Sequence, residues 1–294
     1  MQSVKLKNHL HLHFLVFIAG FTAILGEVIS LSAIPLVWYR MLIAGFFMLL
    51  FIKIKKISLK VSVVTVLKFF TAGIVIALHW ITFFAAIKVS NISITLAMFS
   101  TGAFFASLIE PIFFRRKIIY YEIILGLFVI AGVFMIMQTE LQYLMGIGLG
   151  ILSALFSSLF AVMNGKFVER YNASAISFYE FASGVLFISI FLAFSKEGFK
   201  ASFFELSTSD IIYLLLLASV CTAYAFIASV YVMRYISPYT VVLTYNFEPI
   251  YGILLAVIFF PENEIMSPLF YLGAGLIIAT VLGNALFKYK MGKN

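Results

Sequence analysis

Residues 247–283 read FEPIYGILLAVIFFPENEIMSPLFYLGAGLIIATVLG, two apolar runs joined by a short acidic turn. An α-helix needs about 20 mostly apolar residues to cross the hydrocarbon core of a bilayer, and runs of this kind approach that length. Glu248 and Pro249 stand inside the first run, where a charge is costly and a proline cannot donate a backbone hydrogen bond. The stretch therefore predicts membrane-crossing helices with one acidic residue at membrane depth.

The composition of the whole chain agrees with this interpretation. The 294 residues are 64% hydrophobic and 11% charged, with a mean hydropathy of +1.12, whereas about a quarter of the residues of a soluble domain are charged. We predict an all-α polytopic membrane protein with short connections, whose first span is kept as an anchor. The ten predicted transmembrane helices are 12–32, 34–53, 64–88, 92–113, 120–138, 144–165, 174–195, 210–233, 238–260 and 267–287.

The basic residues predict the orientation in the membrane. With the N-terminus inside, most Lys and Arg residues fall in cytoplasmic segments, while Lys88, Lys196 and Lys200 fall on the opposite side, as expected from the positive-inside rule. Both termini are then cytoplasmic, in a multi-pass protein of the plasma membrane (the bacterial inner membrane). The net charge of +8 is thus a topology signal. We expect a lipid bilayer around the protein and no nucleic-acid partner.

The chain also contains an internal repeat. Residues 85–136 align with the stretch 232–283 without a gap. In this register Ser90 matches Ser237, Gly126 matches Gly273 and Phe113 matches Phe260. The end of the eighth predicted helix and the whole of the ninth and tenth thus match the end of the third and the whole of the fourth and fifth.

A weaker match pairs residues 26–40 with 165–180 and needs one inserted residue. Together the two matches predict a first five-helix domain at 1–140 and a second at 141–294. Because five is odd, the second domain must cross the membrane in the opposite sense to the first. Inverted repeats recur in transporters, whose substrate site lies near the midplane where the halves meet. The repeat favours transport over catalysis.

The ten short-looped helices in two repeats, closed by the stretch 247–283, resemble the drug/metabolite transporter superfamily, EamA type. The most specific part is Glu-Pro followed by a span, an acidic turn and a Leu-Gly helix. The first half departs from this pattern, because Thr101-Gly102 matches Glu248-Pro249 and Arg115-Arg116 replaces the turn carrying Glu262. The resemblance implies a central cavity between the third, fourth, eighth and ninth helices, flanked by the first and sixth. It also implies export of amino acids or other small metabolites.

Glu248 is the first candidate for the substrate site. It lies near the middle of its predicted span, with Tyr245 and Asn246 one turn earlier and Thr101 at the matched place in the fourth span. One interpretation is that Pro249 kinks the helix and Glu248 pairs structurally with a neighbour. The other is that Tyr245, Asn246 and Glu248 face a cavity and contact the substrate or a proton.

Aromatic residues of the third span are further candidates. His79, Trp80 and Phe83 lie past its middle at helical spacing, and Tyr224 in the eighth span falls close to the matched position. Such a stripe commonly packs against other helices or lipid. Because the third and eighth helices line the cavity in the family that the chain resembles, these four residues are also candidates for substrate contact.

Three charged residues are candidates for an ion pair or a gate. Glu27 and Arg40 lie in the outer third of the first two spans, and we expect them to pair across that hairpin. Arg40 could instead bind a substrate carboxylate, because guanidinium is a planar bidentate donor. Glu180, which the weaker repeat match aligns with Arg40, could belong to an inner gate.

These observations predict a transporter of small organic metabolites, most simply an exporter of amino acids or aromatic metabolites by alternating access, with protons as a second partner if Glu248 titrates. The alternative is an importer or antiporter of anionic metabolites such as sugar phosphates, which would need several Lys or Arg residues at midplane depth. We expect no enzyme activity, cofactor or metal, because the sequence has no phosphate-binding loop, catalytic triad or cluster of metal ligands.

Overall fold

The computed structural model describes residues 2–115, 117, 120–196, 198–232, 235 and 244–291. These residues form helices and connections, without a strand. Hydrocarbon offers no water to backbone groups, so apolar runs of this length fold into helices, which satisfy their own N–H and C=O groups. Seven helical segments within this part are long and apolar enough to cross a membrane. Three shorter apolar helices, Ile124–Thr139, Glu248–Phe259 and Pro268–Asn284, lie where the fifth, ninth and tenth spans are predicted.

Two helices of the first half begin at polar residues that cap them. The hydroxyl of Ser62 accepts a hydrogen bond from the backbone of Thr65, and the side chain of Asn91 accepts one from the backbone of Ile94. Such caps satisfy N–H groups that have no partner within the helix. The helices are α1 (Gln2–Val28), α2 (Ala33–Ile54), α3 (Val63–Val89), α4 (Ile92–Phe99), α5 (Gly102–Phe114) and α6 (Tyr120–Thr139).

The second half follows the same course. Asn172 and Ser207 cap two of its helices in the same way. Its elements are η1 (Leu141–Tyr143), α7 (Leu144–Phe167), α8 (Ala173–Phe194), α9 (Ala201–Phe204), α10 (Thr208–Ala218), the π-helix η2 (Ser219–Tyr224), α11 (Ala225–Val232), α13 (Glu248–Phe259), α14 (Pro261–Glu264) and α15 (Pro268–Met291). The eighth predicted span runs without interruption through α10, η2 and α11 as far as Val232, the last of its described residues.

Two predicted spans differ from the structure. The fourth, 92–113, is present as one candidate span, Ile92–Phe114, but it contains a local break, because α4 ends at Phe99 and α5 begins at Gly102. The ninth, 238–260, is described only from residue 244, and α13 begins at Glu248. The first part of that span lies outside the described residues.

The helices pack so that elements of one half contact elements of the other. Helix α3 packs against α7 and α8, and the segment from α10 to α11 packs against α1 and α2. Helix α1 packs against α13, and α7 packs against α4 and α5. Helices α2 and α8, α4 and α13, and α6 and α15 also meet. Each of these contacts thus has a counterpart in which the two halves are exchanged.

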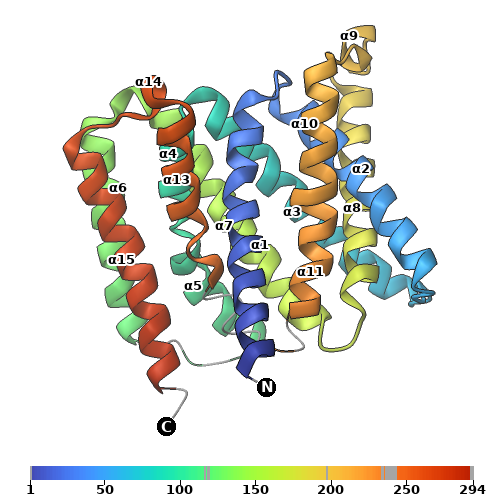
Figure 1. The fold of residues 1–294 in the computed structure, drawn as a ribbon, viewed down its shortest axis with the longest axis horizontal. Coiled ribbons are helices and arrows are strands. Elements are labelled where there is room, and N and C mark those ends of the chain that lie inside the picture. Colours follow the sequence, from blue (N-terminus) through green and yellow to red (C-terminus); the bar gives the residue numbers. More distant parts are fainter. Residues whose placement is uncertain are drawn as a thin grey trace.

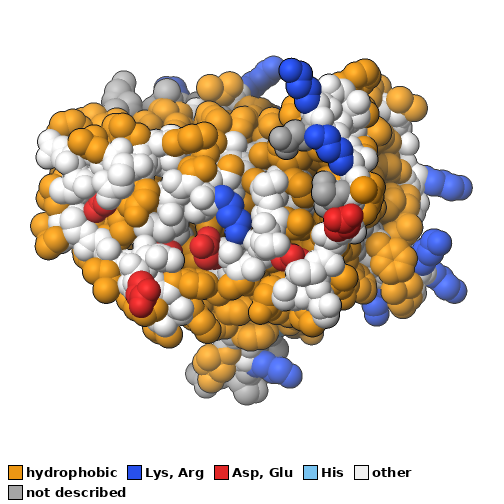
Figure 2. All heavy atoms as spheres, turned by 90° about the horizontal axis from the view of Figure 1, so that it is seen from above, with side chains coloured by type: hydrophobic (Ala, Val, Ile, Leu, Met, Phe, Trp, Pro, Cys, Tyr) orange, Lys and Arg blue, Asp and Glu red, His pale blue; other side chains and the backbone are white. Residues whose placement is uncertain are grey.

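The bundle has two distinct ends. Helix α1 begins and α15 ends at the same end, which we call the terminal end (Figure 1). The opposite end carries α9 and α14 and is called the α14 end (Figure 1). Seen from above in Figure 2, acidic and basic side chains lie among backbone and uncharged side chains coloured white over the middle of that end, and hydrophobic side chains surround them.

Polar contacts tie neighbouring helices together at the α14 end. The Asp210 carboxylate, at the start of α10, accepts hydrogen bonds from the Ser30 backbone N–H (2.7 Å) and from the hydroxyls of Ser30 and Ser207 (both 2.6 Å). The Lys88 Nζ donates to the backbone oxygens of Glu27 (2.9 Å) and Ile29 (2.8 Å). The chain after α1 is thereby held to both α3 and α10.

The same end holds α14 onto α4. The two carboxylate oxygens of Glu264 accept hydrogen bonds from the backbone N–H groups of Ile92 (2.9 Å) and Ser93 (2.8 Å), the first residues of α4. The Asn91 amide donates to the backbone oxygen of Asn263 (3.1 Å). A carboxylate at a helix N-terminus satisfies its free N–H groups and complements the helix dipole. Glu264 therefore fastens the connection between α13 and α15 to the beginning of α4.

Candidate functional site

A helix break lies at the middle of the fourth predicted span. Ser100 and Thr101 separate α4 from α5, and Thr101 is only 3% exposed. The hydroxyl of Thr101 donates to the backbone oxygen of Met98 (2.6 Å), and that of Ser100 donates to the oxygen of Leu96 (2.9 Å). These hydroxyls satisfy carbonyl groups near the break. The Thr101 hydroxyl, predicted to contact substrate, bonds to the backbone in this structure.

A second break lies at the matched position of the other half. Thr244 and Tyr245 are helical, and Asn246 and Phe247 form a turn in which the Phe247 N–H donates to the Thr244 oxygen (3.0 Å); α13 starts immediately afterwards. Pro249 occupies the first turn of α13, where its missing N–H costs nothing. The sequence interpretation of Pro249 as a kink within a helix is therefore wrong: the proline helps to begin one. Since α4 and α13 pack together, both breaks belong to contacting segments.

Glu248 is the first residue of α13 and is half-buried, as are Tyr245 and Asn246 just before it. The Tyr245 hydroxyl forms a 2.7 Å hydrogen bond with the hydroxyl of Ser229 on α11. The three candidates of the ninth span thus lie together beside α11, on the segment where the helix is interrupted. That position leaves Glu248 at a helix N-terminus, which favours a negative charge.

Arg40 is buried, with 4% of its surface exposed. Its Nε donates to the hydroxyl of Thr222 in η2 (2.9 Å), and its guanidinium carbon lies 3.9 Å from the centre of the Trp80 ring and 5.6 Å from that of Phe84. Stacking on an aromatic face stabilises a desolvated guanidinium. The Arg40 Nη1 atom is buried without a hydrogen-bond partner among the described residues. One donor of the guanidinium is therefore unused.

Arg40 does not meet Glu27 in the described part of the chain, contrary to the predicted ion pair. The guanidinium turns toward α3 and η2, whereas Glu27 lies near the α14 end, where its backbone oxygen accepts from Lys88. The opposite charge that Arg40 does interact with is that of Glu248. The two side chains are close enough for electrostatic interaction, yet no ion pair between them is formed among the described residues. The pairing of Glu27 with Arg40 was inferred from sequence proximity, which leaves the rotation of α2 open.

The π-helix η2 positions the partner of Arg40. The Thr222 hydroxyl donates to the backbone oxygen of Leu217 (2.8 Å), five residues earlier, and is completely buried. A π-helical turn holds one more residue than an α-helical turn and is frequent at functional sites. Tyr224 ends the same turn, is 41% exposed, and bonds through its hydroxyl to the His11 Nε2 (2.8 Å). One distorted turn therefore presents Thr222 to Arg40 and Tyr224 to α1.

The other candidates of α3 pack against neighbouring helices. The His79 Nδ1 lies 2.8 Å from the Ser153 hydroxyl on α7, and its ring stacks on Phe99 at 5.3 Å. The Phe83 ring also meets Phe99, at 5.7 Å. Trp80 is the exception, because its ring lies under Arg40. Among these aromatic residues, Trp80 therefore contacts a charged group. His79 and Phe83 instead contact Phe99, the last residue of α4, beside the first break.

Glu180 lies apart from these residues, on α8. It is completely buried, and its Oε1 accepts a 2.8 Å hydrogen bond from the Asn164 amide on α7. Its Oε2 has no hydrogen-bond partner among the described residues. Sequence analysis did not connect Asn164 with Glu180, although both were visible as polar residues within apolar spans.

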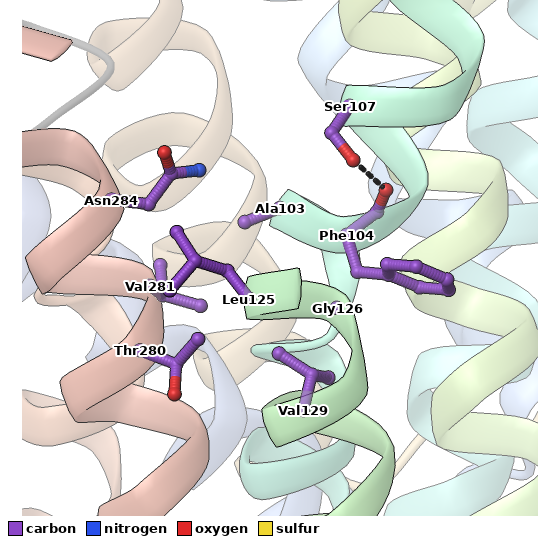
Figure 3. Close-up of a pocket in the computed structure, with 9 residues that line it drawn as sticks. All are labelled: Ala103, Phe104, Ser107, Leu125, Gly126, Val129, Thr280, Val281 and Asn284. Carbon is purple, nitrogen blue, oxygen red and sulfur yellow. Dashed lines mark hydrogen bonds between the residues drawn. The ribbon is translucent and has the colours of Figure 1, made fainter. Parts of the chain in front are cut away.

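Two cavities lie away from the Arg40 cluster. The smaller one, between α5, α6 and α15, is lined by Ala103, Ser107, Gly126 and Asn284 among others and contains none of the predicted site residues (Figure 3). Its volume of about 10 Å³ has room for a single water molecule at most. It is therefore too small for a metabolite.

The larger cavity has a volume of about 640 Å³, within the usual range of ligand pockets. It lies toward the terminal end, where α2 ends and α8 begins. Tyr224 is the only predicted site residue on its described wall. The described lining consists of His11, Phe51, Lys55, Ile57, Asn172, Ser174, Tyr224, Ile227, Ala228 and Tyr231.

Sequence analysis missed Thr222 and Phe84, which complete the surroundings of Arg40. Thr222 carried a usable signal, because a hydroxyl in an apolar span needs a partner. Phe84 carried none, since phenylalanine is the ordinary packing residue of this chain. Both contacts depend on how α2, α3 and η2 are rotated, which periodicity does not determine.

Comparison with known proteins agrees with this architecture. No curated protein matches the chain, whereas 22 chains of solved structures do. One of these, described only as "Crystal structure of protein", is 14% identical, with a TM-score of 0.64 over 96% of this chain and 98% of that one; identity this low shows a shared fold alone. The model of the EamA-like transporter family matches residues 9–138 and 144–286. Because these matches cover nearly all of the sequence, the chain belongs to the EamA-like transporter family.

Proposed function

We propose that this protein exports amino acids, with aromatic or other large apolar side chains preferred, by alternating access. The observation that carries the proposal is the relationship of Arg40 and Glu248. Their opposite charges are near enough to influence each other, yet the two side chains form no ion pair in the described part of the chain, and the Arg40 Nη1 atom is buried there without a hydrogen-bond partner. An amino acid carries a carboxylate and an ammonium group a few ångströms apart. Such a zwitterion can neutralise both residues at once.

Arg40 provides the carboxylate end of this site. Its Nε is engaged by Thr222 and its ring face by Trp80, so the guanidinium is held in one orientation while Nη1 stays free to donate. A fixed guanidinium binds a carboxylate with less loss of side-chain entropy than a mobile one. The Trp80 and Phe84 rings beside it offer an apolar surface to the substrate side chain.

Glu248 provides the ammonium end. It stands where the ninth span is interrupted, beside Tyr245 and Asn246, whose polar atoms can help to orient the substrate. Discontinuous helices recur at substrate sites of transporters, because the interruption offers polar groups at membrane depth. The matched break at Thr101 lies in α4–α5, against which α13 packs through α4. We assign the two breaks as the flexible points around which the halves move.

The architecture proposed for this movement is two inverted repeats of five transmembrane helices, residues 1–140 and 141–294. Two observations support it: the helix contacts occur in pairs related by exchange of the two halves, and the two helix breaks lie at positions that the repeat aligns with each other. With both termini in the cytoplasm of a bacterium and the protein in the inner membrane, the 640 Å³ cavity opens toward the cytoplasm. Tyr224 on its wall and Thr222 on Arg40 belong to one turn, which joins this vestibule to the substrate site.

The α14 end would then be the closed outer gate. Asp210, Lys88 and Glu264 hold α1, α3, α4, α10 and the chain before α15 together there. Export would require these ties to open while the vestibule closes. The described state corresponds to one that accepts substrate from the cytoplasm.

An anionic metabolite such as a sugar phosphate suits the site less well. Arg40 is the sole Lys or Arg side chain that is buried in the described part of the chain, and the Glu248 carboxylate would repel a dianion. A substrate with two or more negative charges needs more cations at that depth than the site offers.

Transport in proteoliposomes tests the proposal. We expect purified protein to exchange radiolabelled phenylalanine or leucine across the membrane, and Glu248→Gln to reduce the exchange about tenfold or more, because a charged hydrogen bond is lost. Glu205→Gln, which changes an exposed glutamate outside the spans, is the matched control. Exchange of sugar phosphates but not of amino acids by the wild-type protein would overturn the assignment.

A further inference from the structure

The buried carboxyl of Glu180 has an environment that the substrate site does not explain. No part of Glu180 is exposed, and its Oε1 accepts one hydrogen bond, from Asn164. The other oxygen, Oε2, is buried without a partner in the part of the chain that the structure describes. Helix α8 is held closely against α3 here, because a Cβ atom at Gly73 would overlap the Glu180 backbone oxygen and the Ser183 hydroxyl, which itself donates to Phe70 (2.7 Å).

Among the described residues, no cation compensates this carboxyl. Helix α8 packs against α2, α3 and α11, and Asn164 joins it to α7. The charged and titratable side chains of these helices, besides tyrosines, are Arg40, Lys53, Lys68, His79, Lys88 and Lys166. The four lysines are exposed, Arg40 bonds to Thr222, and His79 bonds to Ser153. The tyrosines are Tyr39, which bonds to Phe203, Tyr179, which bonds to Leu59, and Tyr231, which is exposed. Within the described residues none of them contacts Glu180.

A carboxylate in such a place would be a buried charge without a counterion, which costs several kcal/mol. A neutral carboxylic acid leaves at most one O–H group unpaired, a cost of about 1–3 kcal/mol. The Asn164 amide is a neutral donor, so it can bond to Oε1 whether the carboxyl is ionised or protonated. Its hydrogen bond therefore does not remove the difference in free energy between the two forms. The geometry therefore favours a bound proton in this state.

The position of Glu180 suggests what the proton does. In the weaker repeat match Glu180 is aligned with Arg40, and the helices that carry these two residues, α8 and α2, pack together. Arg40 keeps its charge and is supported by Thr222 and Trp80, whereas Glu180 can bind or release a proton. Glu180 begins the third turn of α8 from the terminal end, where Asn172 caps the helix. A small separation of α8 from α3 and α7 on that side would admit water to Oε2.

We propose that Glu180 is a proton-binding site, occupied when α3, α7 and α8 are closed around it and emptied to water when they separate, so that one proton moves with each transport cycle. The coupling of this proton to transport rests on the proposed function, whereas proton binding by Glu180 is independent of it. The proton comes from bulk water and returns to it, with no covalent step. Glu248 in this scheme binds substrate and carries no coupling proton.

Infrared difference spectroscopy of the purified protein tests proton binding directly, without any substrate. On titration between about pH 5 and 10 we expect a carboxylic acid C=O band that is present in the wild type and absent in Glu180→Gln. Glutamine keeps an oxygen that accepts from Asn164, so the variant should fold, and its melting temperature checks this. A wild-type spectrum identical to that of Glu180→Gln over the whole range would overturn the proposal.

Proteoliposomes test the coupling. In Glu180→Gln we expect pH-gradient-driven accumulation of substrate to fall to the level reached without a gradient, while exchange of substrate at equal pH continues; Glu205→Gln should behave like the wild type in both assays. Gradient-driven accumulation that survives in Glu180→Gln would overturn the coupling role. If the wild type carries none of the amino acids offered, the proposed function fails, and the infrared experiment still decides whether Glu180 binds a proton.

Discussion

Arg40 on α2 donates a 2.9 Å hydrogen bond from Nε to the hydroxyl of Thr222 in η2, a contact between the two halves of the chain that is completely buried on the Thr222 side. The same hydroxyl donates to Leu217 within the π-helical turn. The distortion of the eighth span and the orientation of the guanidinium thus depend on one hydroxyl group. That dependence makes Thr222 a sensitive probe of the site.

Replacing Thr222 by valine should disturb the site without changing its volume. The substitution leaves the buried Arg40 Nε without its partner, and we expect a loss of about 1–3 kcal/mol, together with weaker substrate exchange. Thr222→Ser retains the hydroxyl and should stay close to the wild type in both respects. Thermal unfolding and exchange in proteoliposomes measure the two effects. Equal behaviour of the valine and serine variants would show that the hydroxyl does not position Arg40.

Close packing of α3 on α8 predicts a sharp difference between two glycines. A Cβ atom at Gly73 would lie 2.8 Å from the Cα atom of Glu180, whereas one at Gly148 would meet nothing within 4 Å. Overpacking of a tight contact costs about 1–3 kcal/mol. We expect Gly73→Ala to lower the melting temperature by several degrees and Gly148→Ala to leave it nearly unchanged. Similar melting temperatures of the two variants would contradict the observed helix packing.

The carboxylate ties at the α14 end predict a loss of stability on their removal. Asp210 accepts three hydrogen bonds, two of them from Ser30 across the bundle. Asp210→Ala leaves these donors unpaired, and we expect it to destabilise the protein by about 3 kcal/mol, whereas Glu205→Ala at an exposed site should have little effect. Thermal unfolding in detergent compares them. An Asp210→Ala variant as stable as Glu205→Ala would mean that this tie does not hold α1 to α10.

Glu264 predicts a dependence of stability on pH. Burial raises the pKa of its carboxyl, although the backbone N–H groups of Ser93 and Ile92 act in the opposite direction. The folded protein then binds this proton more tightly than the unfolded chain, so its contribution to stability is complete below the ordinary pKa and is lost as pH rises through the raised one. We expect the melting temperature of the wild type, minus that of Glu264→Gln, to increase as the pH is lowered from 8 to 4. The opposite trend would show that the fold prefers the ionised carboxylate.

Much of the fold could be predicted from the apolar runs, because membrane-crossing helices have few alternatives in hydrocarbon. The limits of α2, α3 and α8 differ from the predicted spans by a residue at most. The break at Ser100 and Thr101 could not be predicted in this way, since neither residue forbids a helix. Pro249 did signal a break in the matched half, but its role as the start of α13 needed the structure.

The candidate site was less accessible to sequence reasoning. Arg40, Trp80 and Glu248 were recognisable because charges and large aromatic residues are conspicuous at membrane depth. Which of them meet depends on helix rotation: the predicted partner of Arg40 was Glu27, and its observed partners are Thr222 and Trp80. The π-helix that presents Thr222 has no signature in the sequence. Contacts between distant spans are decided by packing, which a hydrophobic pattern constrains only loosely.

The most direct test of the central claim is a binding measurement with three ligands: phenylalanine, phenethylamine, which lacks the carboxylate, and phenylpropionate, which lacks the amine. We expect the wild type to bind phenylalanine about tenfold or more tightly than either analogue, because each loses one charged contact. Arg40→Gln should no longer distinguish phenylalanine from the amine, and Glu248→Gln should no longer distinguish it from the acid. Equal affinity of the wild type for all three ligands, or unchanged preferences in both variants, would contradict the account.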